Sequence, residues 1–454
     1  MSDPTGRAEP PAGAAAAGAL LVRVAVTASV ILLALVGAAA FLPGRRLWGI
    51  NHLAFYPVAL RIGLLALAGI CFVPAVARKC YAALLGLARL AEARPRLGVS
   101  LIVAASLVSV AIFMRFHSAT LLLGDGQLVA NNFGYAAGNV QAGHAQTVDL
   151  PAILRTQPTA KGSTAAYYLA AKVSGGLSRH SPVAAIRGLN CILGGAFILV
   201  LLLVVMGGFA TSLSAELRVW LGVLALSSGA MELFFGYIEN YTPLLFFATL
   251  YVASSMVFME KHRGAWLVAA LGFLVASIFM HVAGILLLPS FGLLAGSIPI
   301  EKCRPTLARR LARWLAPALL VLVLVGTVGV AKFTGLGNDF LPLRTTGDLE
   351  GILSPAHWLD VLNEILLMMP AFPVLAVVAI ASVLLARRPG LTARGTVAVG
   401  SELGVRHANV PGGLFALVVA APCLLFLAVF KSEISVPRDW DLFALSSIGL
   451  VPAG

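Results

Sequence analysis

Long apolar stretches recur along this 454-residue chain and constrain its fold more than any other feature. Most of them are roughly 17 to 25 residues long, the length at which a helix crosses the hydrocarbon core of a bilayer. Hydrophobic residues make up 59% of the chain and charged residues only 11%, which excludes an ordinary soluble domain. The sequence therefore predicts an all-α, polytopic membrane protein with about 11 to 12 transmembrane helices.

The predicted spans are Leu20–Leu42, Ala54–Ala77, Leu97–Phe116, Ile186–Met206, Leu217–Phe235, Tyr241–Met259, Ala265–Met280, Val282–Ile298, Leu315–Val330, Leu362–Leu385 and Leu414–Phe430. The first is long for a cleaved signal peptide, so we expect a retained helix. The stretch Leu442–Val451 is too short to cross alone, and we expect this last helix to continue past Gly454.

The chain divides into a short tail and one membrane domain. Residues 1–19 are rich in Ala, Gly and Pro, which predicts a disordered N-terminal tail. Residues 20–454 form the predicted transmembrane domain. Within it, residues 117–185 are expected to form a long extracytoplasmic loop with interfacial helices, and residues 331–361 a second outer loop.

Lys and Arg residues set the predicted orientation. With the N-terminus in the cytoplasm, the basic residues fall in four loops on the cytoplasmic side, within residues 78–96, 260–264, 300–314 and 387–407. This bias accounts for much of the formal charge of +13, so no nucleic-acid partner is needed. No CxxC pair indicates a zinc or redox site. We expect a multi-pass protein of the inner (plasma) membrane, with its active face outside the cytoplasm.

The first candidate site residue is Asp125, at the start of the long outer loop. Gly124 and Gly126 flank it, and glycines on both sides allow a tight turn that brings a carboxylate close to a substrate. The sequence makes Asp125 a candidate catalytic residue. The alternative is a Gly-Asp-Gly turn that only closes a helix.

A second cluster of polar residues lies at the junction of two predicted spans. Glu232 and Glu239 share one face with Gly236 if the helix continues through all three. Tyr237 and Asn240 add hydroxyl and amide groups, so the cluster is a candidate substrate-binding site. The alternative is that the tyrosines belong to an ordinary interfacial belt.

Two further groups complete the candidate site. His281 interrupts an apolar run and can bind phosphate or transfer a proton, or it can be a structural hydrogen-bonding residue. After the eleventh span, Lys431 and Arg438 can hold a phosphate, and Asp439 and Asp441 can hold a divalent cation or orient those basic side chains. The alternative for this segment is a charged loop beside the membrane. The spacing of these residues does not by itself predict a metal site.

In plan the chain resembles the GT-C superfamily of membrane glycosyltransferases, which includes protein O-mannosyltransferases and the lipid A aminoarabinose transferase. The resemblance rests on many helices, an acid in a long early outer loop, and further polar outer loops. It implies a polyprenyl-phosphate sugar donor and a glycan, lipid or protein acceptor. By resemblance Asp125 acts on the acceptor, and Arg438, Lys431 or His281 holds the donor phosphate. The chain departs from the usual plan in having a lone Asp and one additional helix before the loop.

Two other functions remain open on the sequence alone. In a transporter or flippase, Glu232 and His281 would line a path across the membrane, and discontinuous helices would favour that function. In a non-catalytic membrane subunit of envelope biogenesis, the acidic residues would recruit a partner protein.

The predicted orientation can be tested with reporter fusions. A reporter fused after Gly126 should lie outside the cytoplasm and one fused after Arg310 inside it, because the basic loops remain on the cytoplasmic side. Paired alkaline phosphatase and fluorescent protein fusions measure this. If both fusion sites report the same compartment, the predicted sidedness is wrong.

Overall fold

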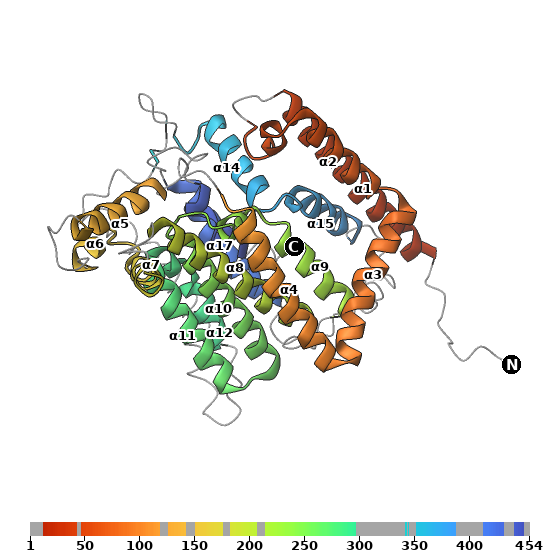
Figure 1. Ribbon diagram of the computed structural model, residues 1–454. Coiled ribbons are helices and arrows are strands. Elements are labelled where there is room, and N and C mark those ends of the chain that lie inside the picture. The colour runs from red at the N-terminus through yellow and green to blue at the C-terminus, as the bar shows by residue number, and fades with distance from the viewer. Residues whose placement is uncertain are drawn as a thin grey trace.

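The computed structural model describes residues 12–42, 47–118, 126–141, 150–175, 182–206, 214–296, 341–342, 344, 351–386, 412–430 and 440–448. Within these ranges the regular structure is helical and there is no strand, so the predicted all-α class is confirmed (Figure 1). Four of the described helices are long and apolar enough to cross a membrane, or up to six if each of two bent pairs counts as one span. This is fewer than the 11 to 12 expected, although the predicted span Leu315–Val330 lies outside the described residues.

The first half of the chain contains α1 (Ala12–Phe41), η1 (His52–Phe55), α2 (Val58–Ile70), α3 (Pro74–Ala93), α4 (Pro95–Arg115), α5 (Gly126–Gln141), α6 (Leu150–Thr156), α7 (Lys161–Val173), α8 (Pro182–Val205) and α9 (Ala215–Leu226). The second half contains η2 (Gly229–Phe234), α10 (Tyr241–Lys261), α11 (Gly264–Met280), η3 (Val282–Leu287), α12 (Leu288–Gly296), α14 (Pro355–Met368), α15 (Phe372–Ala386), α17 (Gly412–Val429) and η5 (Trp440–Phe443).

Proline breaks two of the predicted spans. The span Ala54–Ala77 divides into α2 and α3, whose axes differ by 82°, and the span Leu362–Leu385 divides into α14 and α15, whose axes differ by 99°. In the first pair Pro74 begins α3, and in the second Pro370 follows the end of α14. A proline disfavours helical geometry in the residue before it, so the chain changes direction at these points.

Side-chain caps break two more predicted spans. The span Leu217–Phe235 stops at Leu226, and η2 begins after Ser228, whose Oγ accepts a hydrogen bond from the backbone N–H of Ala230 at 3.3 Å. The span Val282–Ile298 begins as η3, because Nδ1 of His281 accepts a hydrogen bond from the N–H of Ala283 at 3.1 Å. Each cap satisfies an N–H at the start of a new short helix.

Helix α10 lies in the middle of the bundle, and 61% of its most apolar window is buried. It contacts α7, α8, α11, η2 and η3, and its side chains join a core that also includes residues of α4, α14, α17 and η5. Helix α1 begins at Ala12 rather than at Leu20 and packs beside α15 at the edge of the molecule, with none of its apolar window buried (Figure 1).

The helix bundle has two ends, and the turn between α10 and α11 lies at the first of them. The α10–α11 turn carries Lys261 and Arg263, and the N-terminal end of α9 lies beside α3, where Arg89 Nη2 pairs with Glu216 Oε1 at 3.1 Å. The buried guanidinium of Arg218 pairs with Glu92 nearby. The C-terminal ends of α4 and α11 and the N-terminal ends of α8 and α10 meet at the opposite end, where hydrogen bonds and a ring contact join them through residues 235–241. We call this opposite end the junction end.

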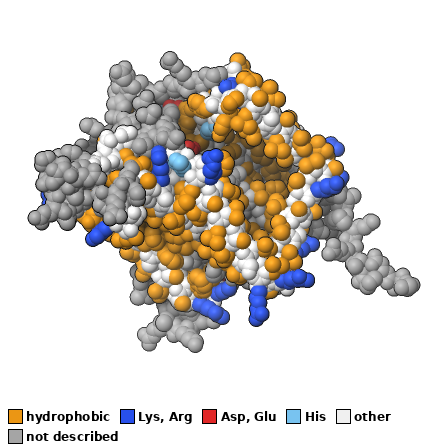
Figure 2. All heavy atoms as spheres, in the orientation of Figure 1, with side chains coloured by type: hydrophobic (Ala, Val, Ile, Leu, Met, Phe, Trp, Pro, Cys, Tyr) orange, Lys and Arg blue, Asp and Glu red, His pale blue; other side chains and the backbone are white. Residues whose placement is uncertain are grey.

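Hydrophobic side chains cover most of the described surface on the face shown in Figure 2, and Asp and Glu are sparse there. Large apolar side chains are exposed along several helices, for example Val22 of α1 (63%), Ile62 of α2 (55%) and Leu107 of α4 (66%). An exposed apolar surface of this extent is expected for helices that face lipid and not for helices that face water.

A glycine substitution tests the close packing of α8 at the junction end. In Gly194→Ala the added Cβ would lie 2.6 Å from Cβ of Phe234 and 2.7 Å from Cε2 of Phe113, so unfolding should become easier by about 1–3 kcal/mol. Thermal unfolding of the purified protein in detergent measures the change. Gly188→Ala on the same helix meets no atom within 4 Å and is the matched control. Equal melting temperatures for the two variants would contradict the close packing.

Candidate functional site

A short loop between η2 and α10, residues Phe235–Asn240, is the centre of the candidate site. We call it the junction loop. It leaves helical geometry at Gly236, whose φ of +70° is in the left-handed region that glycine adopts without strain. Glu232, Gly236 and Glu239 therefore do not share a helical face, because the continuous helix on which that arrangement depended is absent from residues 229–261. Glu232 lies on η2 with an exposed side chain, whereas Glu239 is fully buried.

Polar groups from surrounding helices bind the carbonyl groups of the junction loop. The N–H of Ser118, just after α4, donates to the carbonyl of Phe235 at 2.7 Å. Nδ2 of Asn190 on α8 donates to the carbonyl of Tyr237 at 2.7 Å. These hydrogen bonds satisfy acceptors that the loop cannot satisfy within a helix of its own.

Helix α7 binds the second half of the junction loop. The hydroxyl of Tyr167 donates to the carbonyl of Glu239, and Oγ of Ser163 lies 2.8 Å from the carbonyl oxygen of Asn240 and 3.1 Å from that of Met280. The amide of Asn240 donates to Oε1 of Gln157 at 3.1 Å, in the turn before α7. The helix therefore joins the loop to the end of α11.

The carboxylate of Glu239 lies inside this network with no exposed surface. Its Oε2 accepts a hydrogen bond from the N–H of Asn240 at 3.3 Å. Burial raises the pKa of the neighbouring Tyr167 above its usual range; the hydrogen bond from Asn190 opposes this effect, and the negative charge of Glu239 adds to it. Tyr167 is therefore protonated at neutral pH and remains a hydrogen-bond donor.

The start of α5 lies directly against the junction loop. A Cβ at Gly126 would lie 2.6 Å from the carbonyl oxygen of Ile238, so only glycine fits at this contact. Gly126 follows Asp125 in the chain, and Ile238 precedes Glu239. Two segments that the sequence identified separately thus meet at one point, although Asp125 itself lies outside the described residues.

His281 lies at the edge of the same network. Its ring packs against the ring of Tyr241 with 4.6 Å between centroids, and Nδ1 accepts a hydrogen bond, so the proton of the neutral ring is on Nε2. Burial lowers the pKa of His281 to about 4. At neutral pH this residue offers an N–H donor and carries no positive charge.

Two further residues, His117 and Arg187, flank the junction loop. A Cβ at Gly236 would lie 3.3 Å from Cβ of His117 and 3.4 Å from Cβ of Arg187, so these residues flank the loop at the point where it turns. Arg187, Asn190 and Cys191 lie on one face of α8, at the three- and four-residue spacing of a helix. The sequence reasoning missed Arg187 and Asn190, although both are polar residues within or beside an apolar stretch.

The last group of expected residues is only partly described. Lys431, Arg438 and Asp439 lie outside the described residues. Asp441 is fully buried on η5, beside α17. Among the residues that the structure describes, no group of three or more His, Cys, Asp or Glu side chains could hold a metal ion. The divalent cation remains a prediction that depends on Asp439 as well as Asp441.

Glu364 is a further buried acid that the sequence reasoning did not single out. It has no exposed surface and lies on the face of α14 that carries Val361 and Met368 into the main core. The signal was present, because an acid interrupts the apolar run of this segment.

No family model, no curated protein and no solved structure matches this chain. The fold and the site therefore define its class: a helical protein with several apolar helices compatible with a membrane location and a buried polar network at one end of the bundle.

The pKa of His281 predicts how stability depends on pH. An unfolded histidine titrates near 6.5 and the folded one near 4, so the unfolded state binds more protons between these values. The stabilisation is complete above about pH 6.5 and is lost as the pH falls toward 4. Melting temperatures in detergent between pH 7.5 and 4.5 measure this. The variant His281→Gln should lose less stability over this interval, and an unchanged pH dependence would contradict the assignment.

Proposed function

We propose that this protein is a membrane glycosyltransferase that moves a sugar from a polyprenyl-phosphate donor to an acceptor at the extracytoplasmic face. The contact between Gly126 and the carbonyl of Ile238 is the observation that carries the proposal. It brings the chain neighbour of Asp125 to the chain neighbour of Glu239, so two acidic segments converge on one end of the bundle. Acidic side chains near the hydrocarbon of a membrane cost free energy, so their presence in two adjoining segments favours a functional role.

In this proposal Asp125 removes the proton of the acceptor as general base. The leaving phosphate gains negative charge during transfer, and cations near it stabilise the transition state. Arg187 flanks Gly236 and supplies such a group, in addition to Lys431 and Arg438, which the sequence suggested. The junction loop is held in place by hydrogen bonds from α7 and α8.

A transporter or flippase is the second candidate function. The bent pairs α2–α3 and α14–α15 favour it, because discontinuous helices are common around the sites of transporters. The fully buried carboxylates Glu239 and Glu364 would then belong to a transport path. The two functions differ in whether a covalent bond to the sugar is broken.

Removing the carboxylate of Asp125 tests the transferase. Purified protein in nanodiscs is supplied with undecaprenyl phosphate carrying radiolabelled glucose, mannose or galactose, together with an extract of envelope glycolipids, and release of undecaprenyl phosphate is measured. Asp125→Asn should lower turnover by about 10²-fold or more while expression and melting temperature stay normal, since a positioned general base contributes about that much. Equal turnover in both proteins would overturn the role of Asp125.

A matched pair of glycine variants tests the contact that carries the proposal. Gly126→Ala collides with the carbonyl of Ile238 and should reduce turnover, whereas Gly134→Ala on the same helix meets no atom within 4 Å and should not. If the wild type breaks no donor bond but moves an intact lipid-linked sugar across a vesicle membrane, the transporter is the correct function.

A further inference from the structure

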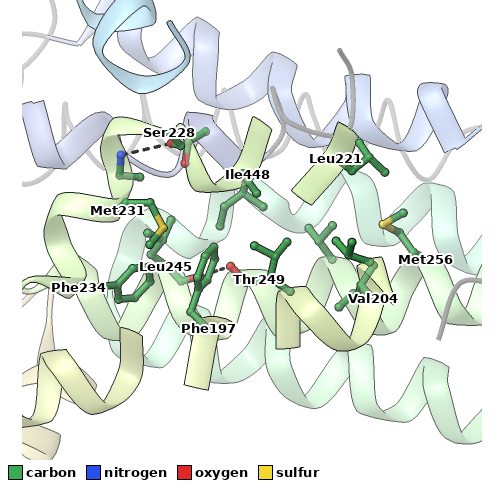
Figure 3. A pocket seen from close by; sticks show the side chains of 17 residues that line it. Phe197, Val204, Leu221, Ser228, Met231, Phe234, Leu245, Thr249, Met256 and Ile448 are labelled. Atoms are coloured by element: carbon green, nitrogen blue, oxygen red, sulfur yellow. Dashed lines mark hydrogen bonds between the residues drawn. The ribbon is translucent and has the colours of Figure 1, made fainter. Parts of the chain in front are cut away.

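An apolar pocket reaches Phe234, the residue directly before the junction loop (Figure 3). Its empty volume is about 770 Å³, counting the part that opens to the outside. Helices α8, α9 and α10 form its walls together with η2 and the C-terminal residues Ser447 and Ile448. Three of its lining residues, Ala230, Met231 and Phe234, belong to the same short helix as Glu232.

Each of the three hydroxyl residues in the pocket wall makes a hydrogen bond to the backbone of its own segment. Thr249 donates to the carbonyl of Leu245 at 2.8 Å, and Ser447 donates to the carbonyl of Ala444 at 2.7 Å. Ser228 accepts the N–H of Ala230. The other lining side chains are hydrocarbon or thioether, so the pocket suits a hydrocarbon chain and not a polar head group.

The pocket has a limited length. Along α10 it reaches from Leu245 to Met256, which is about 16 Å at the helical rise per residue. Near its far end α8 and α9 touch, since a Cβ at Gly222 would lie 2.9 Å from Cγ2 of Val205. At about 1.3 Å per methylene, this length holds about 12 methylenes. An acyl chain of a membrane lipid matches that length, whereas a polyprenyl chain is several times longer.

The near end of the pocket adjoins the candidate site. Phe197 and Phe234 stack there with 4.8 Å between ring centroids. Phe234 is followed at once by the junction loop, and His117 and Arg187 flank that loop at Gly236. A lipid whose chain lies in the pocket would therefore present its head group near His117, Arg187 and Glu232.

We propose that the pocket binds one acyl chain of a membrane lipid and that this lipid is the acceptor of the sugar. The identity of the acceptor rests on the proposed transferase function, but the occupancy of the pocket does not. The pocket thereby selects a lipid acceptor over a protein or a free glycan, and the polyprenyl donor binds elsewhere.

Photocrosslinking tests the occupancy. The full-length protein is placed in nanodiscs containing phosphatidylglycerol with a palmitoyl chain that carries a mid-chain diazirine, and crosslinked peptides are identified by mass spectrometry. Labels should concentrate on the α8 and α10 peptides that line the pocket. Labels spread evenly over lipid-exposed helices such as α1 and α4 would overturn the proposal, and so would strong labelling of the pocket by a photoreactive polyprenyl phosphate that palmitoyl lipid does not displace.

Variants of α8 provide the matched controls. Leu201→Trp fills the pocket and should reduce labelling by about tenfold or more, whereas Ile192→Trp on the same helix, where the side chain is 52% exposed, should leave labelling unchanged. Leu201→Ala widens the pocket and should retain labelling, which keeps the test decisive if the Trp variant folds poorly. Unchanged labelling in a folded Leu201→Trp protein would contradict binding of the acyl chain in this pocket.

The acceptor role has its own readout. In the transfer assay, label from the donor should appear on the palmitoyl lipid fraction, and Leu201→Trp should lower that transfer without lowering donor hydrolysis by water. Transfer to a protein or free glycan alone would overturn the acceptor role. If lipid binds the pocket but no donor bond is ever broken, the proposed transferase fails while the acyl-chain site stands.

Discussion

Hydrogen bonding of backbone carbonyls at one end of the bundle is the constraint on which the rest of the structure depends. The junction loop leaves helical geometry inside the protein, so its carbonyls need donors from elsewhere. Ser118, Asn190, Tyr167 and Ser163 supply them from the end of α4 and from α8 and α7. Moving any of these helices would leave a buried acceptor without its donor, so the candidate site is held rigidly by elements that are distant in sequence.

The same break in the chain connects the polar site to the apolar pocket. The short helix η2 ends where the junction loop begins, and its Met231 and Phe234 line the pocket while Glu232 faces outward. A ligand with a hydrocarbon chain and a charged head group would satisfy both surfaces at once. A continuous helix through this region would not have provided the turn at Gly236.

Sequence reasoning predicted some spans well because hydropathy over a long window reports burial in lipid or core. The predictions Leu97–Phe116 and Tyr241–Met259 agree closely with α4 and α10. The prediction of continuous spans was wrong where an apolar stretch changes direction, as at Pro74 and Pro370. Hydropathy measures only how apolar a segment is and does not report a bend in the chain. The spacing of Glu232 and Glu239 could not decide whether a helix continues through them, since it carries no information about the turn between them.

The sequence alone determined the all-helical class, the apolar character of the helices and the choice of Glu239, Asn240, Tyr237 and His281 as unusual residues. These properties are local, and composition and periodicity record them. Only the tertiary structure decided that Gly126 lies against Ile238 and that Asn190 binds the carbonyl of Tyr237. Such contacts depend on how helices pack across large separations in the chain, and side-chain shape and hydrogen-bond geometry decide that packing.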